Sequence, residues 1–500
     1  MLEIIEKLHG MVWGLPTVIL ILAVGIYLSI KSRFFQIRCF PHAFRSFLSA
    51  FQKNDQRGND VSPYQALCTA LAATVGTGNI VGVAGAISIG GPGAIFWMLV
   101  CAFFGMVIKC CEAVLSVRYR KKLSDGEIHG GPMYIIEYGM GAKWKWLAVL
   151  YAVFGVVAAF GVGNATQINA VISSIHSTFM AFEINVSFHI DLLIATGLAG
   201  LIACLQLGGA KRIGKITESL VPVASLVYIL LGMGILIVRA KYIPAALSAI
   251  MLGVTSPEAV TGGAVGSIFL VCRTGASRGV FTNEAGMGTA SIAHASANVK
   301  HPVEQGMMGM MEVFLDTVVI CTVTALVILC SGVSVPYGTD TGASLTIKAF
   351  SLLYGNWASV LLSFCLILFA VATVVGWGLY GLRCAQYLFG PSVKNVFIIL
   401  QIITVIVCSL LNTGTIWMLA DCMNALMSIP NLLALLILSP EFIQLLKEYR
   451  KGLILPIGGT NENINQCEPL RTVTNEKVSP LGGKSTKGRK TNISSEYWPA

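Results

Sequence analysis

Charged residues are scarce in this chain: Asp, Glu, Lys and Arg make up 12% of its 500 residues, whereas a soluble globular domain carries about 25%. Hydrophobic residues reach 55%, and the mean hydropathy is +0.75. A chain with so little charge cannot cover itself with a water-facing surface. The composition therefore excludes an ordinary soluble domain and predicts that most of the chain faces lipid or other protein segments.

Motifs for hydrolytic chemistry are also missing. The sequence has no P-loop of the GxxxxGK[ST] type and no HExxH motif, which are the patterns that cradle phosphates and bind catalytic zinc. Fourteen cysteines are present, but none forms a CxxC pair and many lie inside apolar runs, so we expect reduced, buried thiols. We expect no enzymatic activity and no resident cofactor.

Apolar runs long enough to cross a bilayer, about 20 residues each, recur along the chain. They are continuously apolar rather than alternating, so they predict an all-α polytopic membrane protein rather than a barrel. Eleven spans are expected, at residues 13–30, 63–88, 92–117, 146–178, 189–207, 216–238, 263–297, 304–332, 357–388, 393–411 and 415–438.

The basic residues follow a topological pattern. They gather in alternate loops and in the tail, whereas the opposite loops hold little Lys or Arg. Because positively charged loops stay in the cytoplasm, we expect an outside N-terminus and a cytoplasmic C-terminus. This pattern explains the net charge of +10 better than a nucleic-acid partner does.

The predicted spans divide the chain into four segments. Residues 1–62 hold an extra N-terminal helix and a basic loop, and residues 63–238 and 239–449 hold two groups of five spans. Residues 450–500 form a polar tail rich in Gly, Ser and Lys. We expect this tail to be disordered, because it cannot bury enough apolar surface to fold.

Span 2 carries Gly76, Thr77, Gly78 and Asn79 near its middle. Glycine costs roughly 1 kcal/mol against alanine in a helix, so this stretch predicts local unwinding at membrane depth. The freed amides would suit a carboxylate, and the freed carbonyls near Val75 would suit a cation. The alternative is that the Gly-x-Gly pattern lets two helices pack closely.

Span 7 is too long and too polar for a plain spanning helix. We predict a break at Thr274 and Gly275, with a second helix from about Arg278, because charged residues such as Arg278 and Glu284 are costly at membrane depth unless they face protein or water. The alternative is a re-entrant or cytoplasmic helix in which both charges are solvated.

The two interrupted spans open corresponding groups of five spans. Two such segments in matching positions indicate an inverted-repeat transporter with its site at the bilayer midplane. This prediction depends on hydropathy and glycine placement, since no convincing residue-by-residue repetition joins the halves.

Other polar residues also lie at membrane depth. Gln167 in span 4 can bind a ligand or tie two helices together. Thr373 and Trp377 in span 9 are four residues apart and share one face; they can bind Na⁺ and wall a pocket, or simply bond back to the helix and pack. Asp316 in span 8 is a functional candidate as an intramembrane carboxylate, or it pairs structurally with an arginine of span 7.

Several stretches resemble the sodium:alanine symporter family, also called the alanine or glycine:cation symporters. The run from Gly90 to Gly105 resembles the family signature, and further similar stretches lie at residues 73–84, 130–134, 277–295 and 301–306. The likeness spans roughly residues 13–449. Leu99 stands where the family usually has an aromatic residue and Thr282 where it has serine; we expect neither to touch the pocket.

The resemblance implies a five-plus-five inverted-repeat core like that of the sodium:neurotransmitter symporters, with one extra N-terminal helix, in a bacterial or archaeal plasma membrane. It implies import of a small neutral amino acid, alanine or glycine, with Na⁺ or alternatively H⁺. The implied substrate residues are Gly76, Thr77, Gly78, Asn79, Gln167, Thr274, Gly275 and Trp377, and the implied Na⁺ ligands are the carbonyls of Ala72 and Val75 with Thr373. Asp316, Arg278 and Glu284 are further candidates for a coupling or structural role. The oligomeric state is left open.

Two other functional classes are less consistent with these residues. An ion channel needs a continuous polar stripe along a pore, whereas the polar residues here cluster at mid-depth. A membrane-embedded enzyme needs an intramembrane His or Asp constellation, whereas we expect His294 and His301 near a cytoplasmic end and only Asp316 at depth. We also expect Lys109 and Glu112, three residues apart, to form a local ion pair.

Overall fold

The computed structural model describes residues 15–52, 61–123, 127–184, 188–207, 209–339, 341–409 and 413–452. The first part of the chain forms α2 (Leu15–Lys31), α3 (Phe35–Arg38), α4 (Phe40–Gln52), α5 (Pro63–Thr74), η1 (Thr77–Asn79), α6 (Val81–Gly90), α7 (Gly93–Arg118), α8 (Pro132–Tyr134), η2 (Ile135–Met140), η3 (Ala142–Trp144), α9 (Lys145–Phe160), η4 (Gly161–Ala165), α10 (Thr166–Ala181), α11 (Phe188–Gln206) and α12 (Gly209–Val238). The second part forms η5 (Ala240–Tyr242), α13 (Ile243–Thr255), α14 (Pro257–Thr261), α15 (Ile268–Asn283), α16 (Thr289–His294), α17 (Pro302–Val313), η6 (Phe314–Cys321), α18 (Thr322–Ser331), α19 (Ser344–Tyr354), α20 (Trp357–Phe389), η7 (Pro391–Val393), α21 (Lys394–Cys408), α22 (Thr413–Ile437) and α23 (Ser439–Arg450). The start of predicted span 1, at Trp13, and the tail after Gly452 lie outside the described residues.

The described residues confirm a polytopic helical membrane protein. Seven helices are long and apolar enough to cross a membrane, or nine if each of two bent helix pairs counts as one span. Two shorter apolar helices, Pro16–Lys31 and Ala240–Thr255, accompany them. The second of these falls in a region where no span is predicted, and the count of eleven stays a prediction.

The thirteen cysteines within the described part of the chain are all free thiols, as expected.

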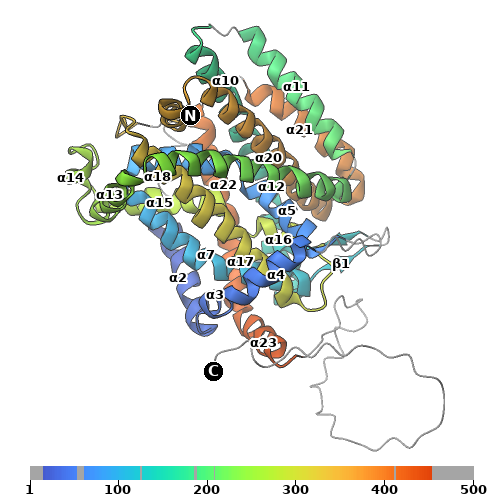
Figure 1. Cartoon of the computed structure of the whole chain (residues 1–500). Coiled ribbons are helices and arrows are strands. Elements are labelled where there is room, and N and C mark those ends of the chain that lie inside the picture. The colour runs from blue at the N-terminus through green and yellow to red at the C-terminus, as the bar shows by residue number, and fades with distance from the viewer. Residues whose placement is uncertain are drawn as a thin grey trace, which may run out of the picture.

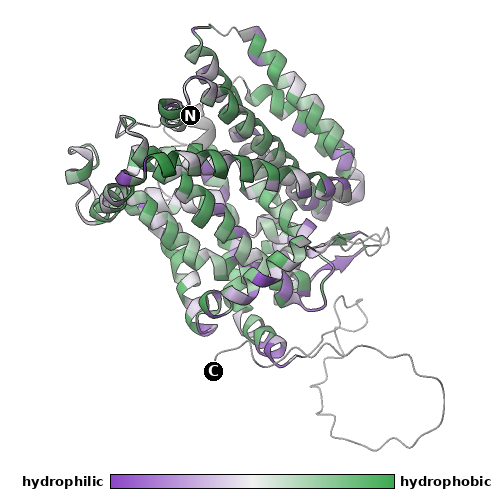
Figure 2. Cartoon of the chain, viewed as in Figure 1, coloured by the Kyte–Doolittle hydropathy of each residue, from purple (hydrophilic) through white to green (hydrophobic). Residues whose placement is uncertain are grey.

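The long helices form one bundle. Helices α15 and α17 pack along α7, and α20 packs against α5, α9 and α10. Figure 1 shows α11 and α21 running side by side along one edge of the bundle. In Figure 2 hydrophobic residues dominate these helices, whereas hydrophilic residues gather on the hairpin of β1 (Lys121–Lys122) and β2 (Ile128–His129) and on α23. The two strands pair antiparallel, Lys121 with His129.

The first predicted helix break is confirmed. Helix α5 begins with a capping box, in which Gln65 N donates to Ser62 Oγ (3.0 Å) and Ser62 N donates to Gln65 Oε1 (3.1 Å). It ends at Thr74, because Val75 takes an extended conformation (φ −75°, ψ 95°). The chain then bends by 59° before it continues into η1 and α6. The glycine-rich stretch therefore interrupts the helix at residues 75–76.

The predicted break at Thr274 and Gly275 is wrong. Helix α15 runs without interruption from Ile268 to Asn283, so no second helix begins at Arg278. A Cβ added to Gly275 would lie 2.3 Å from the Ala94 carbonyl oxygen; Gly275 is therefore small so that α15 can approach α7 closely. This is the packing role that glycine commonly has between membrane helices.

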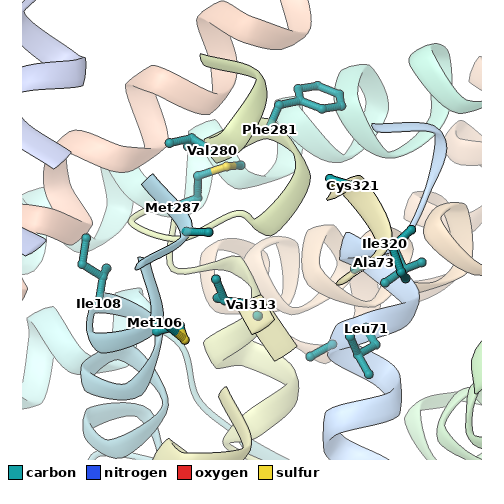
Figure 3. Close-up of a cluster of buried hydrophobic side chains, with 14 of the residues drawn as sticks. Leu71, Ala73, Met106, Ile108, Val280, Phe281, Met287, Val313, Ile320 and Cys321 are labelled. Atoms are coloured by element: carbon teal, nitrogen blue, oxygen red, sulfur yellow. The ribbon is translucent and has the colours of Figure 1, made fainter. Parts of the chain in front are cut away.

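The second helix break follows the end of α15 and starts at Glu284, ten residues after the predicted position at Thr274. Glu284 (φ 54°), Gly286 (φ 91°) and Gly288 (φ 77°) all adopt positive φ before α16 begins at Thr289. Gly286 N and Gly288 N both donate to Glu112 Oε1, at 3.0 and 3.1 Å. Glycine adopts this backbone region at little cost, so the sequence EAGMG marks the true break. Figure 3 shows Val280, Phe281 and Met287 around this break, within one hydrophobic cluster.

The hairpin of β1 and β2 is hydrogen-bonded to α20. Arg383 Nη1 donates to Glu127 Oε2 (2.6 Å) and to Gln386 Oε1 (2.9 Å), and it also contacts the His129 ring. The hydrogen bond from His129, together with the charge of Arg383, lowers the pKa of Glu127 to about 2. The carboxylate therefore stays ionised, and this link persists, at any pH well above that value.

A buried ionic network joins α7, α16 and α17. Lys109 Nζ lies 3.2 Å from Glu312 Oε1, and both side chains are fully buried. Glu312 Oε2 lies 2.8 Å from His294 Nε2, and His294 Nδ1 lies 2.7 Å from Gln305 Nε2. The expected pairing of Lys109 with Glu112 is therefore wrong, because Glu112 binds the amides of the second break. His294 is the last residue of α16 and its side chain is buried; its expected position near the cytoplasmic end stays a prediction.

This network gives a first prediction, for stability. A Lys109→Met change leaves Glu312 buried without its ammonium partner, and breaking a buried ion pair costs about 3–5 kcal/mol. We expect the detergent-solubilised protein to unfold at a clearly lower temperature, measured by thermal melting. The double change Lys109→Met with Glu312→Gln removes both charges and should recover most of the loss. An unchanged melting temperature in the single variant would contradict the assignment.

Candidate functional site

Helices α10 and α20 approach Gly76 in the first break, just after the end of α5. A Cβ added at Gly76 would lie 2.5 Å from Thr373 Oγ1 of α20 and 3.2 Å from Gln167 Oε1 of α10. Only glycine leaves room for both side chains. Residues predicted separately for substrate and for Na⁺ therefore meet at one backbone position.

The backbone amides at this break bind side-chain oxygens. Thr77 N donates to Gln167 Oε1 (3.3 Å), and the Thr77 hydroxyl donates to the same oxygen (3.0 Å). Gly76 N donates to Asn79 Oδ1 (2.9 Å). Gln167 Nε2 in turn donates to the Val162 carbonyl (3.3 Å). An amide oxygen thus takes the place at the helix N-terminus that an anionic carboxylate would occupy.

One predicted Na⁺ ligand, Thr373, reaches Gly76 from α20. Thr373 Oγ1 is buried and has no hydrogen-bond partner within the part of the chain that the structure describes. The amide of Gly76 donates to Asn79 rather than to the Ala72 carbonyl four residues earlier, and Val75 follows at the end of α5. Hard cations prefer such oxygen donors, and a Na⁺ site formed by Ala72, Val75 and Thr373 stays a prediction.

Close packing holds α20 against α5 at this point. A Cβ added at Gly376 would lie 2.9 Å from Ala73 Cβ and 3.0 Å from Ala73 N. Gly376 follows Thr373 by one helical turn, so the same face of α20 that carries the hydroxyl contacts the end of α5. The side chain of Thr373 is thereby placed by helix contact and not by a hydrogen bond of its own.

Trp377 and Glu284 lie together beyond Thr373. Trp377 Nε1 donates to Glu284 Oε1 (2.7 Å), and Thr289 Oγ1 donates to Glu284 Oε2 (2.5 Å). A Cβ added at Gly163 would lie 2.4 Å from Trp377 Cβ, so the backbone of η4 covers one side of the tryptophan. The sequence singled out both Trp377 and Glu284, but it did not predict their contact.

The part of α15 that faces the first break differs from the prediction. A Cβ added at Gly78 would lie 3.2 Å from Phe281 Cδ1 and 3.2 Å from Thr282 Cγ2. Thr274 instead lies beside Gly90, at the far end of α6. Thr274 and Gly275 therefore do not join the site, and Phe281 and Thr282 replace them. The prediction that Thr282 lies away from the pocket is wrong.

The sequence contains the glycines that would have placed Phe281 and Thr282, and not Thr274 and Gly275, beside the first break. Once the break is placed at Gly286 and Gly288 instead of Gly275, the last turn of α15 contains residues 280–283. Arg278 is buried in α15, one turn before Thr282. Its position does not bring it to Asp316.

Asp316 links the first break to η6. Asn79 Nδ2 donates to Asp316 Oδ1 (2.6 Å), and Thr317 Oγ1 donates to Asp316 Oδ2 (2.7 Å). Asn283 Nδ2 donates to Thr317 Oγ1 (3.2 Å), which extends the chain of contacts to the end of α15. Asp316 is fully buried and is bonded to these polar groups rather than to an arginine.

Comparison with known proteins shows which family the chain resembles. Residues 1–455 match the model of the sodium:alanine symporter family. The sodium/alanine symporter AgcS of Methanococcus maripaludis is 40% identical, over 90% of this chain and 97% of that protein. The probable sodium/glutamine symporter GlnT of Bacillus subtilis is 34% identical, over 90% of this chain and 92% of that protein.

Among solved structures, the crystal structure of MhsT in complex with L-phenylalanine shares the fold. The TM-score is 0.56 at 15% identity, and the match covers 76% of this chain and 90% of MhsT. Together with the family match over residues 1–455, the sequence identities and the interrupted helix at Gly76 lead to one conclusion. The chain belongs to the sodium:alanine symporter family.

Proposed function

We propose that this protein is a secondary active symporter that imports a small neutral amino acid, alanine or glycine, with Na⁺ by alternating access. Family membership supports Na⁺-coupled symport of an amino acid. The observation that carries the finer proposal is the convergence at Gly76. The amides at the start of η1 adjoin this residue, and so does the Thr373 hydroxyl, which has no hydrogen-bond partner among the residues that the structure describes.

The substrate carboxylate would bind at the start of η1. The amides of Thr77 and Gly78 lie at the positive end of the second half-helix, and Gln167 now occupies the acceptor position there. A carboxylate would displace Gln167 Oε1 from Thr77 and leave the Gln167 amide group free to bind the ligand. Asn79 shapes the loop, because it binds the amide of Gly76.

We expect a small substrate because bulky side chains surround the proposed binding position. Phe281 and Thr282 crowd Gly78, and Trp377 fills the side of α20 that lies one turn after Thr373. We expect these groups to admit a methyl group rather than a long side chain. The named relatives include one for alanine and one for glutamine, so the residues that line these walls would decide the substrate within the family.

Na⁺ would bind the carbonyls of Ala72 and Val75 together with Thr373 Oγ1. This ion would replace the hydrogen bonds that the end of α5 lacks and would order the segment that binds the substrate. Because both ligands use residues 75–78, each should raise the affinity of the other by the same factor. Coupling would then need no chemical step and no resident cofactor.

The arrangement in the membrane is part of the same proposal. Residues 63–238 and 239–449 would form the two inverted halves of an eleven-span protein, after an extra N-terminal helix in residues 1–62. The N-terminus would lie outside and the C-terminal tail from residue 450 in the cytoplasm, as the basic loops indicate. The membrane would be a bacterial or archaeal plasma membrane.

A proton-coupled carrier is the second candidate. Asp316 favours it, because this fully buried carboxylate contacts Asn79 in the first break, and intramembrane carboxylates commonly belong to proton relays. Uptake of labelled alanine into proteoliposomes separates the two. An inward Na⁺ gradient should drive alanine accumulation when the pH is equal on both sides. Accumulation driven only by a pH gradient would show that H⁺, and not Na⁺, is the coupling ion. Equilibration without accumulation would indicate a channel.

Thr373 provides a prediction for ion binding. Thr373→Ala removes one oxygen ligand, and a hydrogen bond or contact to a charged group contributes about 1.5–3 kcal/mol. We expect the Na⁺ concentration for half-maximal alanine uptake to rise about tenfold or more. Thr373→Ser keeps the hydroxyl and should remain close to wild type. Equal Na⁺ dependence in both variants would remove Thr373 from the ion site.

Gly76 provides a prediction for the shared position. Gly76→Ala places a methyl group 2.5 Å from Thr373 Oγ1 and 3.2 Å from Gln167 Oε1, so we expect loss of both alanine binding and Na⁺ binding. Gly82→Ala in the same span is the control, since its Cβ meets only Thr282 Cγ2 at 3.9 Å. Titration calorimetry on the purified variants measures both ligands. Normal binding to Gly76→Ala would show that the two ligands do not meet there.

A further inference from the structure

We propose that Glu284 is a positioning residue that fixes the indole of Trp377 and thereby sets, from the second helix break, the size of the amino acid that the carrier accepts. This inference rests on the proposed function, because it assigns selectivity within the same site. It adds a link between two segments, residues 284–288 and α20, that are far apart in the sequence.

The hydrogen bond between these residues is fully enclosed. Trp377 is 1% exposed and Glu284 is 2% exposed, and Nε1 lies 2.7 Å from Glu284 Oε1. A buried indole N–H that loses its acceptor must find another one or turn toward water. The other carboxylate oxygen receives the Thr289 hydroxyl at 2.5 Å. Both oxygens of Glu284 are thus fixed, and the acceptor cannot follow a moving indole.

The backbone of Glu284 shows that its side chain matters at this position. Its φ of 54° and ψ of 18° lie in the left-handed region, which is unfavourable for a residue with a Cβ. Gly286 and Gly288, with positive φ in the same turn, are glycines. A glycine would suit position 284 equally well for backbone reasons. The glutamate is therefore explained by what its carboxylate binds.

Two further groups contact the tryptophan. The Gly163 backbone covers its Cβ, and Tyr380 forms an edge contact with its ring at 5.9 Å between centroids. Gly163 belongs to η4, which leads directly to Gln167. Loss of the hydrogen bond to Glu284 would free the polar edge of the ring, and the ring could then shift. Such a movement would widen the pocket on the side where α20 carries Thr373.

The expected effect is on selectivity. One added or missing methylene in an apolar pocket changes the preference about 10–200-fold, so a displaced indole should admit a bulkier side chain. For Glu284→Ala we expect the ratio of kcat/KM for alanine to that for valine to fall about tenfold or more. Glu284→Gln keeps an oxygen acceptor for the indole and should retain most of the wild-type ratio.

A matched control separates positioning from stability. Glu112 binds the same break through Gly286 N and Gly288 N, yet its hydrogen bonds do not involve Trp377. Glu112→Ala should therefore lower the maximal rate for alanine and valine alike and leave their ratio unchanged. In a Trp377→Phe background, which has no indole N–H, Glu284→Ala should produce no further change in the ratio.

Uptake of labelled alanine and valine into proteoliposomes tests the proposal through KM and maximal rate for each variant. If Glu284→Ala changes both substrates in proportion, as Glu112→Ala does, the inference is overturned and Glu284 is structural. If Glu284→Ala does not fold, Thr289→Val takes its place: it frees one carboxylate oxygen and should shift the ratio in the same direction by a smaller factor, and an unshifted ratio overturns the inference. Failure of the wild-type protein to accumulate alanine would instead contradict the proposed function.

Discussion

The structure depends on one constraint: a helix interrupted at membrane depth leaves backbone amides and carbonyls that lipid cannot satisfy. At residues 75–77 the protein meets this constraint with side chains, since Asn79 accepts from the amide of Gly76 and Gln167 accepts from that of Thr77. Such amide acceptors are weak partners compared with a carboxylate, which forms stronger, charge-assisted hydrogen bonds. The interruption is therefore stable without a ligand and still favours one. This balance suits a transporter, which must bind its substrate and release it.

The two helix breaks are joined to each other by buried polar side chains. Asn79 of the first break contacts Asp316, and Thr317 beside it contacts Asn283 at the end of α15. The second break holds Glu284, which contacts Trp377 one turn from Thr373. Glu112 on α7 then binds the amides of the second break. These contacts connect the two breaks to η6, α7, α15 and α20 through buried polar groups. In a symporter, rather than an enzyme, such links are the means by which two ligands influence one equilibrium.

The sequence predicted the first break because glycines and Asn79 stand together inside an otherwise apolar span, a combination that a continuous helix disfavours. It misplaced the second break because glycine has two uses in membrane helices. Gly275 permits contact with the Ala94 carbonyl, whereas Gly286 and Gly288 permit positive φ, and composition alone does not distinguish them. The ion pair of Lys109 with Glu312, 203 positions along the chain, was missed for a similar reason: spacing within one helix predicts local partners, and contacts between α7 and α17 depend on the tertiary arrangement.

The central claim is that substrate and Na⁺ share the interrupted segment at Gly76. Titration calorimetry of the purified protein measures it most directly, as the alanine affinity with and without saturating Na⁺ and the Na⁺ affinity with and without saturating alanine. The account predicts that each ligand strengthens the other by the same factor, about fivefold or more. Affinities that do not depend on the second ligand would contradict it.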